Sequence, residues 1–181
     1  MKKDIKLSEY RRKTSVSRRI VVTAVMIALS VTGRFIPFFK PITAITVISA
    51  VYLGPITGFT VGAMSALISN FFFGQGPWTL FQMLAWGILG LIAGFMPEIL
   101  KKNRIALAIY GVLSGIAYSF IMDIWSVLWY NRGFDFELYK AALITAVPYT
   151  VLYCISNLIF LLLLAKPFGD KLTRIKIKYG L

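Results

Sequence analysis

Long apolar runs separated by short connections dominate this chain. They extend over residues 17–33, 41–54, 55–73, 79–99, 105–129 and 139–165. An α-helix rises about 1.5 Å per residue, so about 20 apolar residues cross the hydrocarbon core of a bilayer. We therefore predict an all-α fold, an integral membrane bundle of six transmembrane helices. The run over 41–54 reaches only about 21 Å, so a re-entrant hairpin stays an alternative there.

Basic residues gather beside these runs. Of 20 lysines and arginines, eight precede Ile20, three lie in 101–104 and five follow Ala165. Because cytoplasmic segments carry an excess of Lys and Arg, both ends are predicted to be cytoplasmic. The expected organisation is a basic amino-terminal segment, a transmembrane domain and a basic tail, at 1–16, 17–165 and 166–181, in a multi-pass protein of the bacterial plasma membrane.

The net charge of +13 raises the possibility of nucleic-acid binding. The basic clusters sit at the ends of apolar runs and have no soluble fold of their own, which is the distribution that membrane orientation produces. We therefore predict the lipid bilayer, and no nucleic acid, as the partner of these clusters.

Several chemistries are excluded by residue type. The chain has one cysteine, Cys154, and no histidine. A disulfide framework, a Cys/His metal site and a nucleophile with a histidine base are therefore excluded. The sequence also lacks a G-x-x-x-x-G-K-[ST] phosphate loop. An intramembrane enzyme is disfavoured because Asp123 is the one acid placed clearly inside a span. We predict a binding and permeation protein with no catalytic residues, no metal and no cofactor.

Small residues recur at helical spacing. Ala24 and Ala28 in the first run are separated by four positions, which allows another helix to approach closely in lipid. That helix could belong to a partner or to this chain. The pairs Gly58/Gly62 and Gly90/Gly94 repeat the spacing, and we expect them to pack helices within the bundle.

Polar and aromatic residues gather toward the expected outer end of the bundle. The candidate substrate-binding residues are Asn70, Gln75, Trp78, Gln82, Trp86, Asp123, Trp125, Tyr149 and Tyr153. An aromatic belt at the lipid headgroups explains residues near the interface, but Tyr149 and Tyr153 lie about ten or more residues inside their run. The cost of placing Asp123 in a span calls for compensation by a cation such as Arg34 or Arg132, by protonation, or by a ligand.

The region from Val21 to Gly94 resembles the substrate-binding S components of energy-coupling factor (ECF) vitamin transporters. The resemblance rests on the six-span size with basic tails, on Ala24-x-x-x-Ala28, and on Asn70-Phe-Phe-Phe-Gly-Gln-Gly-Pro-Trp78 leading into Phe81-Gln82-Met83-Leu84-Ala85-Trp86-Gly87. This last stretch is most similar to the cobalamin-type S components. The final two runs match mainly in length and hydropathy.

The resemblance implies a subunit that captures a vitamin outside and docks through Ala24 and Ala28 onto a transmembrane coupling (T) subunit carrying two ATPases. It also implies that the S component topples in the membrane to deliver its ligand. Cobalamin or a related compound is the expected ligand, and a queuosine precursor, a flavin or a pterin would use the same amide and aromatic groups. An autonomous homo-oligomeric carrier or channel is the alternative, and it would take up substrate without coupling subunits.

Overall fold

The computed structural model describes residues 2–180 of the chain, and the side chains of residues 16–180. Its helices are α1 Lys2–Gly33, α2 Ile42–Leu53, α3 Pro55–Phe73, α4 Trp78–Phe95, α5 Pro97–Lys102, α6 Arg104–Asn131 and α7 Phe136–Tyr179. Within these residues the structure is helical throughout, apart from the connections. The predicted all-α membrane bundle is confirmed.

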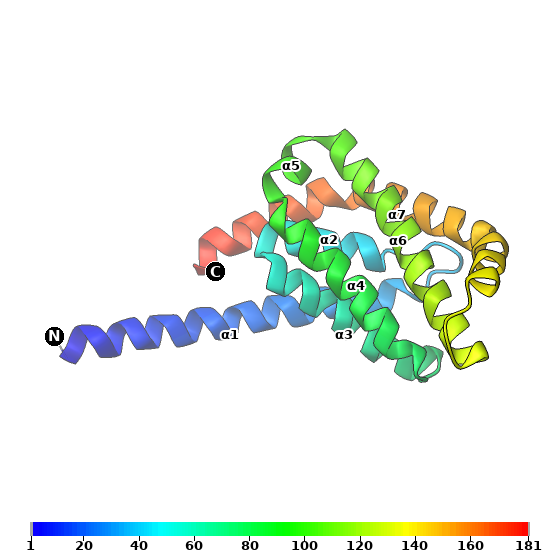
Figure 1. Cartoon of the computed structure of the whole chain (residues 1–181). Coiled ribbons are helices and arrows are strands. Elements are labelled where there is room, and N and C mark those ends of the chain that lie inside the picture. The colour runs from blue at the N-terminus through cyan, green and yellow to red at the C-terminus, as the bar shows by residue number, and fades with distance from the viewer. Residues whose placement is uncertain (1, 181) are drawn as a thin grey trace.

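Helix α2 is the centre of the bundle (Figure 1) and contacts every other helix. All of its residues except Tyr52 are buried. It has 12 residues and rises about 18 Å, which is too short to cross a bilayer core alone. The other predicted spans correspond to five helices, α1, α3, α4, α6 and α7, that are long and apolar enough to cross a membrane. The second predicted span is therefore a short core helix enclosed by protein, and a count of six full spans stays a prediction.

The outer helices continue beyond the predicted runs. Helix α1 begins at Lys2 and α7 ends at Tyr179, so neither expected domain boundary, at 16/17 or at 165/166, is the end of a helix. The fourth predicted span ends earlier than expected, at Phe95, because Pro97 starts the separate short helix α5. Hydropathy locates the apolar part of a helix but does not indicate whether the helix continues into water.

Basic residues from distant parts of the chain meet at one end of the bundle. The Arg18 side chain donates a hydrogen bond to the carbonyl oxygen of Tyr179 at 3.0 Å, and Arg19 donates to the carbonyl oxygen of Leu53. Figure 1 shows the start of α1 and the end of α7 on the same side of the bundle. This arrangement is what the predicted orientation requires, while the side of the membrane itself stays a prediction.

Glycines allow the closest helix contact, between α3 and α4. A Cβ atom on Gly58 would lie 2.8 Å from the carbonyl oxygen of Gly90, and one on Gly62 would overlap the backbone of Trp86. A Cβ atom on Gly94 would overlap Pro55 at the start of α3. All four glycines predicted to pack helices within the bundle therefore lie at contacts that a side chain would obstruct, and Gly62 fixes the position of Trp86.

Candidate functional site

A buried polar network links α1, α3, α4 and α6 at the end of the bundle away from the basic helix ends. We call it the Arg34 cluster, and its members are Arg34, Ser69, Asn70, Thr79, Gln82 and Tyr118. The Arg34 side chain is 9% exposed and donates to Ser69 Oγ and, at 2.7 Å, to Asn70 Oδ1. Arg34 directly follows α1. Its backbone N–H donates hydrogen bonds to the carbonyl oxygens of Ser30 and Val31, so the last helical turn continues to this residue.

Asn70 is the hub of this cluster. Its side chain is 1% exposed, and Nδ2 donates to Thr79 Oγ1 and to Gln82 Oε1, both at 2.8 Å. Gln82 extends the network to α6, because its Nε2 donates a hydrogen bond to the Tyr118 hydroxyl at 3.1 Å. The orientation of each amide is thus set by its neighbours, which is how a buried network becomes rigid.

Aromatic rings enclose the cluster. Trp86 and Tyr118 stack with ring centroids 4.6 Å apart, and Tyr153 meets Tyr118 edge-on at 5.1 Å. The Arg34 guanidinium lies 5.1 Å from the centroid of the Phe73 ring and 5.4 Å from that of Trp86. A cation held against aromatic faces and away from water is well placed to meet a flat, electron-rich ligand.

A second cation, Lys40, borders the same region. Its backbone exchanges hydrogen bonds with Ser156 of α7 at 2.9 and 3.0 Å, which ties the α1–α2 connection to the bundle. Its Nζ lies 5.9 Å from the Phe73 ring centroid. Burial, together with the nearby charge of Arg34, lowers the pKa of Lys40 below the ordinary value for lysine. Two cations therefore lie close together here.

A small pocket opens beside the cluster. It has a volume of about 20 Å³, room for about one water molecule. Its lining residues are Lys40, Ile42, Thr43, Trp86, Gly115, Tyr118, Tyr153 and Asn157. A small-molecule pocket usually has roughly 300–1,000 Å³, so in this structure the candidate site is closed around a water-sized space.

The structure brings together four of the predicted substrate-binding residues, Asn70, Gln82, Trp86 and Tyr153. Gln75 and Trp78 lie outside the pocket, Gln75 in the connection between α3 and α4 and Trp78 at the start of α4. Gln75 donates to the carbonyl oxygen of Leu67 at 3.0 Å and accepts from Thr79 at 3.0 Å, so it stabilises that turn. Trp78 covers Gly76, where a Cβ atom would overlap its ring.

The other three predicted substrate-binding residues lie farther from the cluster. Trp125 packs on Phe81 with centroids 4.9 Å apart, and Tyr149 is 64% exposed. Asp123 is half-buried, and its Oδ2 atom is buried without a hydrogen-bond partner. Among the described side chains no ion pair joins Asp123 to Arg34 or Arg132, so the compensation expected for this carboxylate is not an ion pair there.

Ala24 and Ala28, the predicted partner-binding residues, are both exposed on α1. Ala24 borders a groove of about 550 Å³ between α1 and α3, together with Thr23, Ile27, Thr60 and Met64. This small-residue face is therefore not used to pack α1 against another helix of the described chain, and it is open to a helix from outside.

Comparison with known proteins decides the family. Residues 14–172 match the family described as "ECF-type riboflavin transporter, S component". The chain belongs to this family. The S component is a transporter subunit, which confirms the prediction that it is not an enzyme and places it as a multi-pass protein in the cell membrane.

Relatives of this S component occur in Aliivibrio and Vibrio species. It is 30% identical over 146 residues, 76% of each chain, to a UPF0397 protein of Aliivibrio salmonicida. It is 38% identical over 98 residues to a UPF0397 protein of Aliivibrio fischeri and 34% identical over 98 residues to one of Vibrio atlanticus. The match spans about half the length of the last two relatives. No solved structure matches the S component significantly.

Arg34, Lys40 and Tyr118 of the candidate site were not predicted from the sequence as binding residues. From the sequence, Arg34 was considered only as a cation that could compensate Asp123, because a cation at the end of an apolar run is usually at the lipid headgroups. A signal was available: Arg34 and Lys40 are cations of the predicted outer side, where few cations are expected, and both lie in one short connection.

Proposed function

We propose that this S component captures a vitamin at the outer end of the membrane bundle, with Arg34 as the main anchoring residue. A guanidinium has five N–H donors. Arg34 uses Nη1 for Ser69 and Asn70, while its buried Nε has no partner. The single observation that supports the proposal is this buried cation without an acidic partner among the described side chains.

The physical argument for a ligand is the free energy that burial of the Arg34 charge costs. A buried charge is expensive unless an opposite charge or several acceptors compensate it. The cluster supplies one hydroxyl and one amide oxygen to Arg34, and Lys40 adds a second positive charge nearby. A ligand with an electron-rich or anionic edge would supply the missing acceptors and lower the free energy of the closed state.

A flat heteroaromatic vitamin such as a flavin suits these residues best. Its ring would lie against the walls formed by Trp86, Tyr118 and Tyr153, and its carbonyl oxygens and ring nitrogens would accept from Arg34 and Gln82. The family description, which names riboflavin, supports this choice. A queuosine precursor that carries an amine is disfavoured, because two nearby cations would repel it.

Cobalamin stays the second candidate, from the resemblance of the Asn70–Gly87 region. Its phosphodiester would suit Arg34 and Lys40. The amide of Asn70 is less suited to it than expected, because both donors and the oxygen of that amide are already used inside the protein.

Delivery would require partners. We propose that a T subunit with two ATPases docks at the groove between α1 and α3 that Ala24 borders. Small side chains there allow close helix approach, and the groove lies on a different face from the Arg34 cluster. Capture and docking would then use separate surfaces of the S component.

The test is to identify the ligand directly. Mass spectrometry of small molecules that co-purify with the full chain, followed by titration with riboflavin and with cobalamin, is expected to give a flavin and tighter binding of riboflavin. Tighter binding of cobalamin would instead identify cobalamin, the second candidate, as the ligand. Binding of neither, together with uptake by the chain alone in proteoliposomes, would favour an autonomous carrier instead.

A further inference from the structure

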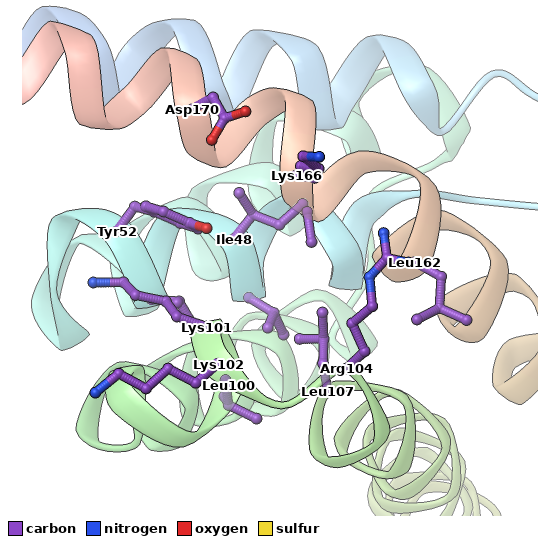
Figure 2. Close-up of a pocket in the computed structure, with 13 residues that line it drawn as sticks. Ile48, Tyr52, Leu100, Lys101, Lys102, Arg104, Leu107, Leu162, Lys166 and Asp170 are labelled. Carbon is purple, nitrogen blue, oxygen red and sulfur yellow. The ribbon is translucent and has the colours of Figure 1, made fainter.

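A second pocket that involves α2 lies at the opposite end of the bundle from the Arg34 cluster. It has a volume of about 380 Å³, within the range of small-molecule sites. Its lining residues are Val47, Ile48, Val51, Tyr52, Leu100, Lys101, Lys102, Arg104, Leu107, Leu162, Ala165, Lys166 and Asp170. In Figure 2, Lys166 and Asp170 of α7 face Lys101, Lys102 and Arg104 across the residues of α2.

The charges of this pocket are unbalanced. Four cations and one acid line it. Lys102 pairs with Glu98 at 2.9 Å, and Lys101 lies 5.1 Å from the centroid of the Tyr52 ring. Neither Arg104 nor Lys166 forms an ion pair with any described side chain. These two side chains come from different helices and line a single pocket, so an anion between them would be bound from two sides.

The floor of the same pocket is apolar. Ile48 is 1% exposed, and Leu107 is 5% exposed. Leu162, at the edge, is 37% exposed on the surface of α7 that a bilayer would cover. Arg104 is the first residue of α6, so the cations stand at the boundary of a membrane-spanning helix. A soluble anion would use only the cations, whereas an amphiphile would use both the cations and this floor.

We infer that this pocket binds the phosphate group of an anionic phospholipid, with Arg104 and Lys166 on the phosphate and the start of an acyl chain on Leu107 and Leu162. Basic pockets between membrane helices on the cytoplasmic side bind anionic headgroups in this way. The site is independent of the vitamin. It would hold α5, α6 and α7 together at the end of the bundle opposite to ligand capture.

The experiment is native mass spectrometry of the full chain in detergent with equal amounts of phosphatidylglycerol and phosphatidylcholine. We expect preferential retention of phosphatidylglycerol. The double variant Arg104→Gln/Lys166→Gln should bind phosphatidylglycerol about thirtyfold more weakly, about 2 kcal/mol at 1.4 kcal/mol per tenfold, since each cation near an anionic surface contributes about half of that.

The matched control is Arg174→Gln/Lys176→Gln, which removes two exposed cations from the same end of α7 outside the pocket. It should keep the lipid preference. Ala165→Phe, which fills the pocket without changing its charge, should lose the preference. Vitamin binding at the other end reports that each variant is folded.

Three results would overturn the assignment. Equal retention of both lipids would exclude an anion site. An equal loss in the control variant would mean that general surface charge, and not the pocket, attracts the lipid. Displacement of phosphatidylglycerol by glycerol phosphate at similar concentration would assign the pocket to a soluble phosphate compound.

Discussion

Arg34 directly follows a membrane helix, yet its side chain is buried in the protein. Directly after a membrane helix, a long cationic side chain would ordinarily extend to the headgroups and water. Here it turns into the protein, where Ser69 and Asn70 accept from it and Phe73 and Trp86 cover it. The inward orientation costs hydration, and this cost is the basis of our proposal that a ligand supplies further acceptors to Arg34.

At the residue scale, Asn70→Ala should destabilise the folded protein. The substitution removes one hydrogen-bond partner from each of Arg34, Thr79 and Gln82, and a buried donor or acceptor left unpaired costs about 1–3 kcal/mol. Thermal denaturation in detergent should show a clear fall in Tm. Gln75→Ala is the control, because exposed Gln75 can be replaced by water, and an equal fall in both variants would contradict the central place of Asn70.

At the scale of the elements, the contact of α3 with α4 should be intolerant of any side chain at Gly62. Gly62→Ala places a methyl group against the backbone of Trp86, and such overpacking costs about 1–3 kcal/mol. Because Trp86 forms a wall of the site, vitamin affinity should fall as well. Gly133→Ala is the matched control, since nothing lies within 4 Å of a Cβ atom there. Unchanged stability and affinity in Gly62→Ala would show that the two helices can separate freely.

A second prediction at this scale separates docking from capture. Ala24→Trp and Ala28→Trp should obstruct close approach of a helix to α1, so association with the coupling subunits and uptake should fail. Vitamin affinity of the isolated chain should be kept, because the Arg34 cluster does not include this face. Ala141→Trp, at an exposed alanine of α7, should affect neither measurement.

Co-purification and uptake assays report the two functions separately. A double variant Ala24→Trp/Ala28→Trp that still binds its partners would show that these alanines have no docking role. Loss of vitamin binding together with partner binding would mean that the face is needed for the fold of this chain.

The elements were more predictable from sequence than the site. Apolar runs between charged or Gly-Pro connections indicated α3, α4, α6 and the apolar parts of α1 and α7, because transfer of these runs into lipid dominates their energetics. Asn70, Gln82, Trp86 and Tyr153 were among the nine residues predicted for the site, because polar and aromatic residues gather toward the expected outer end and Tyr153 lies deep inside its run. Arg34 and Lys40 were missed, because only the fold shows whether a flanking cation turns toward water or toward the core.

For the whole molecule, orientation is the property to test. The gathering of basic residues around Arg18, Lys102 and Tyr179 predicts that this end is cytoplasmic. In a Cys154→Ser background, Lys102→Cys should resist an impermeant thiol reagent added to intact cells, and Glu137→Cys should react. Both side chains are well exposed, at 78% for Lys102 and 81% for Glu137. The reverse labelling pattern would invert the orientation and place the Arg34 cluster inside.

The three proposed sites lie at separate places in the molecule. The Arg34 cluster lies at one end, the pocket of Arg104 and Lys166 at the other, and the groove beside Ala24 on the flank. The buried helix α2 connects the first two, since Ile42 borders the pocket beside the Arg34 cluster and the other pocket is lined by Val47, Ile48, Val51 and Tyr52. With the roles proposed above, the S component would bind its vitamin without its partners and would need them only for delivery.

Isothermal titration of the purified chain with its vitamin, comparing Arg34→Gln with Arg132→Gln, tests the central claim most directly. Both variants replace one arginine that follows a membrane helix, but Arg132 is exposed and outside the cluster. Hydrogen bonds to a charged group contribute about 1.5–3 kcal/mol, so Arg34→Gln should weaken binding roughly ten- to a hundredfold while Arg132→Gln binds like the wild type. Wild-type affinity in a folded Arg34→Gln variant would contradict the account.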